Sequence, residues 1–112
     1  MARTALTVYQ IARTGLEATY VAADDSDMNS FANDGKTFLH VKNTQTDASV
    51  SVTIAIAQEV DGQSVTSRVI GLDAETEEFI GPFDPGVYNQ TTGVVNVDFD
   101  TSASVSVAAI RV

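Results

Sequence analysis

The stretch SVSVTIAIA, residues 49–57, decides the fold class because its apolar and polar side chains alternate. Apolar residues occupy the even positions from Val50 to Ile56, and serine, threonine or alanine fills the positions between them. Successive side chains of a strand point to opposite faces, so this pattern predicts a half-buried strand with one apolar face. A helix would instead need a period of about 3.6 residues. We expect Ile54 to lie in the core.

The same alternation recurs in VVNVDFD (94–100), SASVSVAAIRV (102–112) and KTFLHVKN (36–43). In the last of these, Leu39 and Val41 share one face, and Phe38 and His40 share the other. VTSRVIGL (65–72) and TEEFIGPF (76–83) complete the predicted set of central strands. Helix signals are weak throughout. Short strands separated by turn signals predict a β-sandwich or a small barrel.

Two of the turn signals are specific. Asp61–Gly62 is a strong hairpin pair. In DPGV, residues 84–87, proline and glycine occupy the two central positions that a type II turn requires.

The predicted fold is all-β: a single β-sandwich, jelly-roll or immunoglobulin-like, with an extended N-terminal arm. We expect residues 1–32 to form this arm and an acidic loop, and residues 33–112 to form the sandwich domain. An edge strand of the protein's own sheet is the alternative for the arm.

Composition excludes several classes of partner. The chain has 112 residues, which suits one domain, and no cysteine, so it has no disulfide framework. Fifteen acidic and six basic residues give a net charge of −9, which repels phosphate and argues against nucleic acid. No segment approaches the roughly 18 apolar residues of a membrane span. Residues 1–15 lack the run of about 7–15 apolar residues of a secretory signal. We expect a protein made and used in soluble form.

The acidic stretch DDSDMNSFANDG, residues 24–35, is a candidate metal site. Asp25, Asp27 and Asn29 have the spacing that opens a calcium-binding loop. Ser30 and Lys36 stand where that loop needs glycine and glutamate. We expect a solvated acidic loop and no metal; a looser calcium site is the alternative.

Catalytic patterns are weak. His40 is the only histidine and no GxSxG elbow accompanies it, so neither a hydrolase triad nor a three-ligand zinc site is indicated. The pairs Glu77–Glu78 and Asp98–Asp100 suit solvated strand faces, and no phosphate-binding glycine loop is present. We expect no enzyme activity and no cofactor.

The stretch GPFDPGVYN, residues 81–89, carries two aromatic residues, Phe83 and Tyr88, beside a rigid turn. Two interpretations remain open. The aromatic side chains close a corner of the sandwich, as aromatic clusters usually do, or they form a contact patch for a partner.

The order MARTAL (1–6), FANDGKTFLHVKN (31–43), IGPFDPGVYNQ (80–90), VNVDFD (95–100) and VAAIRV (107–112) resembles small β-rich proteins that tailed viruses and prophages encode beside the major capsid protein. The resemblance implies a virion structural protein of the capsid decoration, or cement, type. Such a protein is made in the host cytoplasm and stabilises the head. It binds the major capsid protein at the capsid surface, as a homo-oligomer or in many copies.

Five residues are candidates for that interface. Arg3, Tyr9 and Arg13 lie on the predicted arm, which would act as a docking strap, and Phe83 and Tyr88 lie on the aromatic turn. Two other functions stay open. One is a head–tail connector or tail structural protein; the other is a carbohydrate- or calcium-binding sandwich, for which Tyr88 near Asp84 offers a pairing of aromatic and acid.

Overall fold

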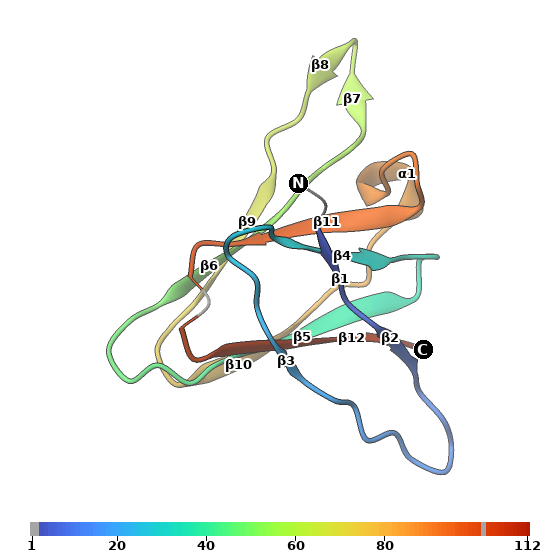
Figure 1. Cartoon of the computed structure of the whole chain (residues 1–112). Coiled ribbons are helices and arrows are strands. Elements are labelled where there is room, and N and C mark those ends of the chain that lie inside the picture. Colours follow the sequence, from blue (N-terminus) through green and yellow to red (C-terminus); the bar gives the residue numbers. More distant parts are fainter. Residues whose placement is uncertain (1–2, 102) are drawn as a thin grey trace.

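The computed structural model describes residues 3–101 and 103–112; the first two residues of the predicted arm and Ser102 lie outside this range. The described chain is all-β and sandwich-like. Two mixed sheets pack face to face without closing into a barrel (Figure 1). The sequence prediction of an all-β sandwich is thus confirmed at this level.

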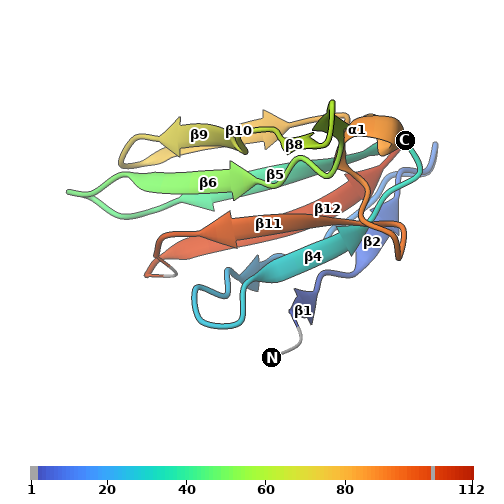
Figure 2. The same cartoon turned by 90° about the horizontal axis from the view of Figure 1, so that it is seen from above.

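Sheet A has the strand order β1 (Thr4–Ala5), β4 (Asn29–Ala32), β11 (Val94–Phe99), β6 (Val50–Ile54) and β9 (Arg68–Leu72). Sheet B has the order β10 (Thr76–Ile80), β5 (Thr37–Asn43), β12 (Val105–Arg111) and β2 (Val8–Gln10), and β3 (Val21–Ala22) also pairs with β12. Figure 2 shows the strands of the two layers from above.

The core lies between the sheets and is built from the predicted alternation. Val50, Val52 and Ile54 of β6 are fully buried. From sheet B, Leu39 and Val41 of β5 face them, as expected. Ile56 lies beyond the end of β6 and is only half-buried. The apolar period therefore identifies the inner face of each central strand.

Two predicted central strands are sheet edges instead. Among the described residues, β9 pairs with β6 alone and β10 pairs with β5 alone. Their exposed burial patterns reflect this position, because an edge strand has a neighbour on one side only. Strands form within both predicted stretches, at residues 68–72 and 76–80, but residues 65–67 and 81–83 lie outside them and the predicted central position is wrong.

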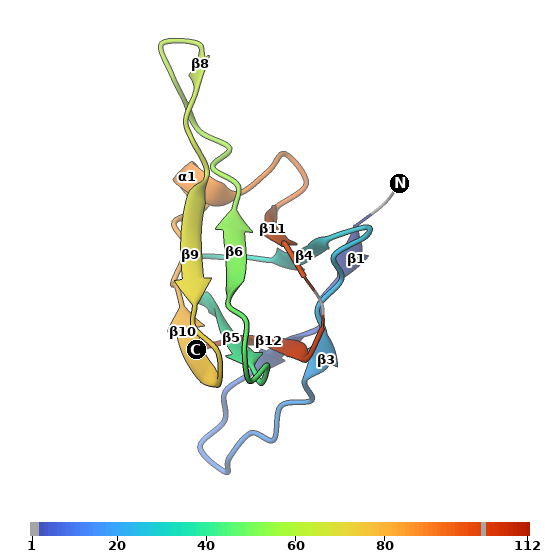
Figure 3. The same ribbon diagram turned by 90° about the vertical axis from the view of Figure 1, so that its left-hand side faces the viewer.

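The Asp61–Gly62 turn is confirmed. Both residues have positive φ, 54° and 76°, as a two-residue hairpin turn requires, and they join β7 (Glu59–Val60) to β8 (Gln63–Ser64). This hairpin projects away from the sandwich (Figure 3).

The structure does not show an extended N-terminal arm. β1 pairs in parallel with β4, and β2 pairs in parallel with β12. Between these two strands Leu6 is buried in the core. Residues 3–10 thus follow the alternative, an edge of the protein's own sheets.

The predicted type II turn at 84–87 is wrong. Pro85–Tyr88 form a single helical turn, α1, with Pro85 in its first turn. The side chain of Asp84 accepts a hydrogen bond from the Gly86 amide and caps the helix. Asp-Pro-Gly suits both structures, because the φ of proline fits the start of a helix as well as a turn.

In the described part of the chain, no helix is long and apolar enough to cross a membrane.

Candidate functional site

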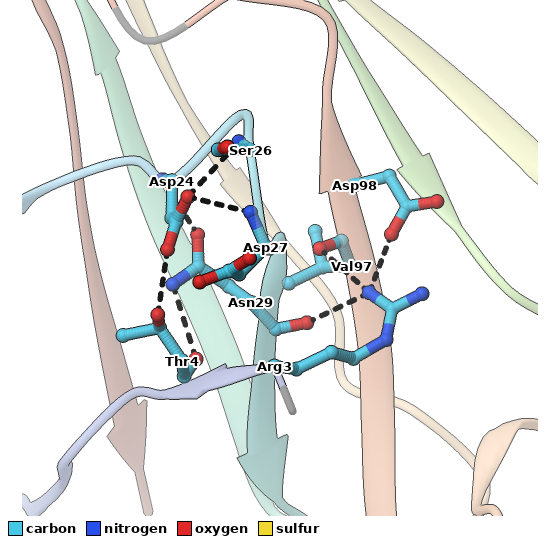
Figure 4. A network of polar contacts seen from close by, with 8 residues as sticks. All are labelled: Arg3, Thr4, Asp24, Ser26, Asp27, Asn29, Val97 and Asp98. Carbon is cyan, nitrogen blue, oxygen red and sulfur yellow. Dashed lines mark hydrogen bonds and ion pairs between the residues drawn. The ribbon is translucent and has the colours of Figure 1, made fainter. Parts of the chain in front are cut away.

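Arg3, a predicted docking residue, is engaged within the chain. Its Nη1 lies 2.5 Å from Asp98 Oδ1 and donates to the Asn29 carbonyl at 3.1 Å (Figure 4). These contacts join β1 to β4 and β11. Arg3 therefore fastens the first strand to sheet A.

The acidic loop is organised around Asp24. Its carboxylate accepts hydrogen bonds from the Thr4 hydroxyl at 2.6 Å and from the amides of Ser26 and Asp27 at 3.0 Å (Figure 4). The Thr4 bond, followed by the amide bonds, holds the pKa of Asp24 below its usual 3.8. Within residues 3–101 and 103–112, no three acidic, histidine or cysteine side chains group so that they could hold a metal ion. The local hydrogen bonds account for the shape of this loop.

Phe83 belongs to the core. Its side chain is 3% exposed and packs against Phe31, with ring centroids 5.5 Å apart, and against the edge of Tyr88 at 5.3 Å. Asn33 Nδ2 donates to the Phe83 carbonyl at 3.0 Å, and Arg68 Nε donates to the Tyr88 hydroxyl at 3.1 Å. The contacts favour the corner interpretation of residues 81–89.

The remaining candidates lie elsewhere. Tyr9 is half-buried on β2, opposite Ile110, and Arg13 is exposed in the connection from β2 to β3. The five candidate residues therefore sit on different elements, and Phe83 and Tyr88 are the pair that the structure brings into contact.

A second group of side chains gathers on the outer face of sheet B; we call it the outer-face cluster. It consists of Tyr20, Phe38, His40, Lys42, Glu77 and Phe79. His40 is only 6% exposed and lies at its centre. The His40 ring stacks on Phe79 at a centroid distance of 4.1 Å, and Phe38 lies beside Phe79 at 6.1 Å.

The hydrogen bonds of His40 fix its tautomer. A carboxylate only accepts, so Nε2–H donates to Glu77 Oε1 at 3.1 Å, and in the neutral ring Nδ1 accepts from the Tyr20 hydroxyl at 2.5 Å. Hydroxyl, imidazole and carboxylate thus stand in the order of a hydrolase triad. Neither of the two clefts beside the cluster is lined by Tyr20. The arrangement is suited to holding residue 20 against the sheet.

One of these clefts is apolar and open. It has a volume of about 380 Å³, and Phe38, Phe79, Ile80, Pro82 and Val112 supply most of its wall. We call it the apolar cleft. Phe79 and Val112 at its rim are 67% and 66% exposed. The cleft lies where β10 ends and the 81–89 segment begins.

Sequence reasoning missed Phe79, although a signal was present. Phe79 and Ile80 are adjacent in one strand, so their side chains must face opposite sides. Ile80 is buried, which leaves Phe79 outside. No such signal marks Tyr20, because its contact with His40 joins two segments whose pairing the sequence does not reveal.

Comparisons with known proteins found no match for this chain. No protein-family model matches the chain. No curated protein and no solved structure matches it either.

Proposed function

We propose that this protein is a virion structural protein of the capsid decoration type, and not an enzyme. It binds the major capsid protein of a tailed virus in many copies and stabilises the head. The sequence resemblance suggests the role. The observation that carries it is the exposed apolar rim of Phe79 and Val112 beside the apolar cleft.

Exposed apolar groups clustered at one place mark an interaction site more often than an inert surface. Here they lie on a sandwich whose central strands bury their inward-facing side chains fully, so the surface is presented by a firm support. The net charge of −9 keeps the rest of the surface soluble. A protein that attaches to a shell needs these properties and no reaction centre.

The proposal includes the finer fold class, a jelly-roll or immunoglobulin-like sandwich. Two mixed sheets are compatible with either class. It also includes the location, at the capsid surface of the virion after synthesis in the host cytoplasm.

Purified expanded capsids, mixed with the protein and sedimented, test the function. We expect many bound copies per head, distributed over the shell in electron micrographs, and a higher temperature of capsid rupture. Binding confined to a few copies at the neck or tail would instead identify a connector or tail protein. Binding to a glycan array, with none to capsids, would identify a carbohydrate-binding module.

A further inference from the structure

We propose that a partner protein adds a strand to the free edge of β10. The added segment is extended and basic, and it places one apolar side chain in the apolar cleft. This inference rests on the proposed function and names the surface through which the protein docks.

The edge is available for pairing. β10 pairs with β5 on one side, in a register that sets Glu77 opposite Lys42 and Phe79 opposite His40. Across the described residues, no strand pairs with its other side. An unpaired edge presents backbone donors and acceptors to an extended peptide, which gains affinity from backbone hydrogen bonds. Contacts of His40 with Glu77 and Phe79 hold β10 in place before any partner arrives.

The charge of this edge selects the occupant. Asp73, Glu75, Glu77 and Glu78 are all exposed along β10 and the turn that leads into it. Lys42, the base opposite Glu77, directs its Nζ over the Tyr20 ring at 4.0 Å. A basic segment is therefore attracted. A second copy of this chain, paired edge to edge, would set these acids against their own duplicates and is disfavoured.

The apolar residues at the end of β10 indicate a docking partner, since acidic side chains alone would serve to protect the edge from aggregation. Charged side chains blunt an edge strand against aggregation, but an exposed phenylalanine beside an open apolar cleft has the opposite effect. Phe79 and Val112 both line this cleft, and its volume of about 380 Å³ is enough for an apolar side chain of the added strand. Backbone pairing, opposite charge and an apolar anchor then act together.

Synthetic heptapeptides test the edge without any capsid. The probe is KVRVKFK with blocked ends, and its acidic counterpart is EVEVEFE. Two further versions of KVRVKFK carry backbone N-methyl groups, one on its odd-numbered and one on its even-numbered residues. Binding is followed by amide chemical shifts and amide hydrogen exchange of the labelled protein.

We expect KVRVKFK to shift and protect amides of residues 76–80, and EVEVEFE to leave them unchanged. Alternate amides of an added strand face the sheet. One N-methylated version should therefore lose at least about tenfold in affinity, while the other stays within about twofold. Equal binding of both versions would mean charge attraction without strand pairing and would overturn the proposal, as would shifts located away from β10.

Charge reversal provides a matched control. The double variant Glu75→Lys/Glu78→Lys should bind KVRVKFK about tenfold more weakly, because two attractions become repulsions. Glu17→Lys/Glu59→Lys makes the same change in net charge at exposed positions away from this edge, with Glu59 on the projecting hairpin, and should bind like the unaltered protein. Equal weakening of peptide binding in both double variants would show that only net charge matters, and would refute docking at the edge of β10. Thermal unfolding checks that all four substitutions leave the fold intact.

The capsid assay separates the two proposals. Peptide binding at β10 without capsid binding would refute the decoration role and keep the edge as a docking site. Capsid binding that Glu75→Lys/Glu78→Lys leaves unchanged would refute the edge and keep the role.

Discussion

Ile54 shows how one side chain connects sequence pattern to stability. It is 0% exposed and lies in the middle of the core. Ile54→Ala should lower the free energy of unfolding by about 2–5 kcal/mol, through lost burial and the cavity left behind. Urea denaturation measures this change. Val69→Ala, at an exposed position of β9, is the control and should stay within about 0.5 kcal/mol. Equal effects would mean that the inner face has been assigned wrongly.

Asp24 links the first strand to the pH dependence of stability. Its pKa is lowered in the folded protein, first by the Thr4 hydroxyl. The stability that ionised Asp24 contributes is therefore present at pH values above its usual pKa of 3.8. It is lost as the pH falls through the lower pKa of the folded protein. Thr4→Val should raise the pKa of Asp24 toward 3.8, measured by an NMR titration of the carboxyl carbon. An unshifted titration would remove Thr4 from this account.

At the residue scale, the sequence predicts which face of a sheet a side chain occupies, but not which residues that side chain contacts. The period of two correctly places Leu39, Val41 and Ile54 inside. It gives no means of finding that Tyr20 bonds His40 or that Arg3 reaches Asp98, since these contacts depend on which strands become neighbours. For this reason the sequence indicates Arg3 as a docking residue, whereas in the structure Arg3 forms an ion pair with Asp98 of the same chain.

At the scale of elements, the N-terminal strands should be indispensable to the fold. Deleting residues 3–13 removes β1, β2 and the buried Leu6. We expect a loss of more than about 3 kcal/mol in unfolding free energy, because Leu6 alone should contribute about 2–5 kcal/mol. Circular dichroism melting measures the loss. Arg13→Ser, an exposed change in the same segment, should melt like the intact protein. A truncated chain that melts normally would restore the view of residues 3–13 as a separable strap.

Elements are predicted well where one local rule operates and poorly where two compete. Asp61–Gly62 permits a tight hairpin turn, and it forms one. Asp84-Pro85-Gly86 permits a turn or a capped helical start, and burial of Phe83 beside Tyr88 accompanies the second. The edge positions of β9 and β10 could not be predicted from the sequence, because the order of strands is set by contacts between residues distant in sequence.

For the whole molecule, we expect stability to be independent of divalent cations. The acidic loop is ordered by its own hydrogen bonds, and the described residues form no cluster suited to a metal. Adding EDTA should leave the melting temperature unchanged, and calcium should not raise it. Magnesium serves as the control for general ionic effects. A drop with EDTA that calcium reverses would place a cation in residues 24–35.

The parallel pairing of β2 with β12 has a consequence for biosynthesis. β12 lies in the interior of sheet B, where it also pairs with β5 and β3, yet it is the final strand in chain order. Sheet B therefore cannot assemble while β12 is still inside the ribosomal exit tunnel. Until β12 is available, β2, β3 and one side of β5 lack their partner in this sheet. Apolar strands that lack their partners are prone to aggregate until β12 joins the sheet.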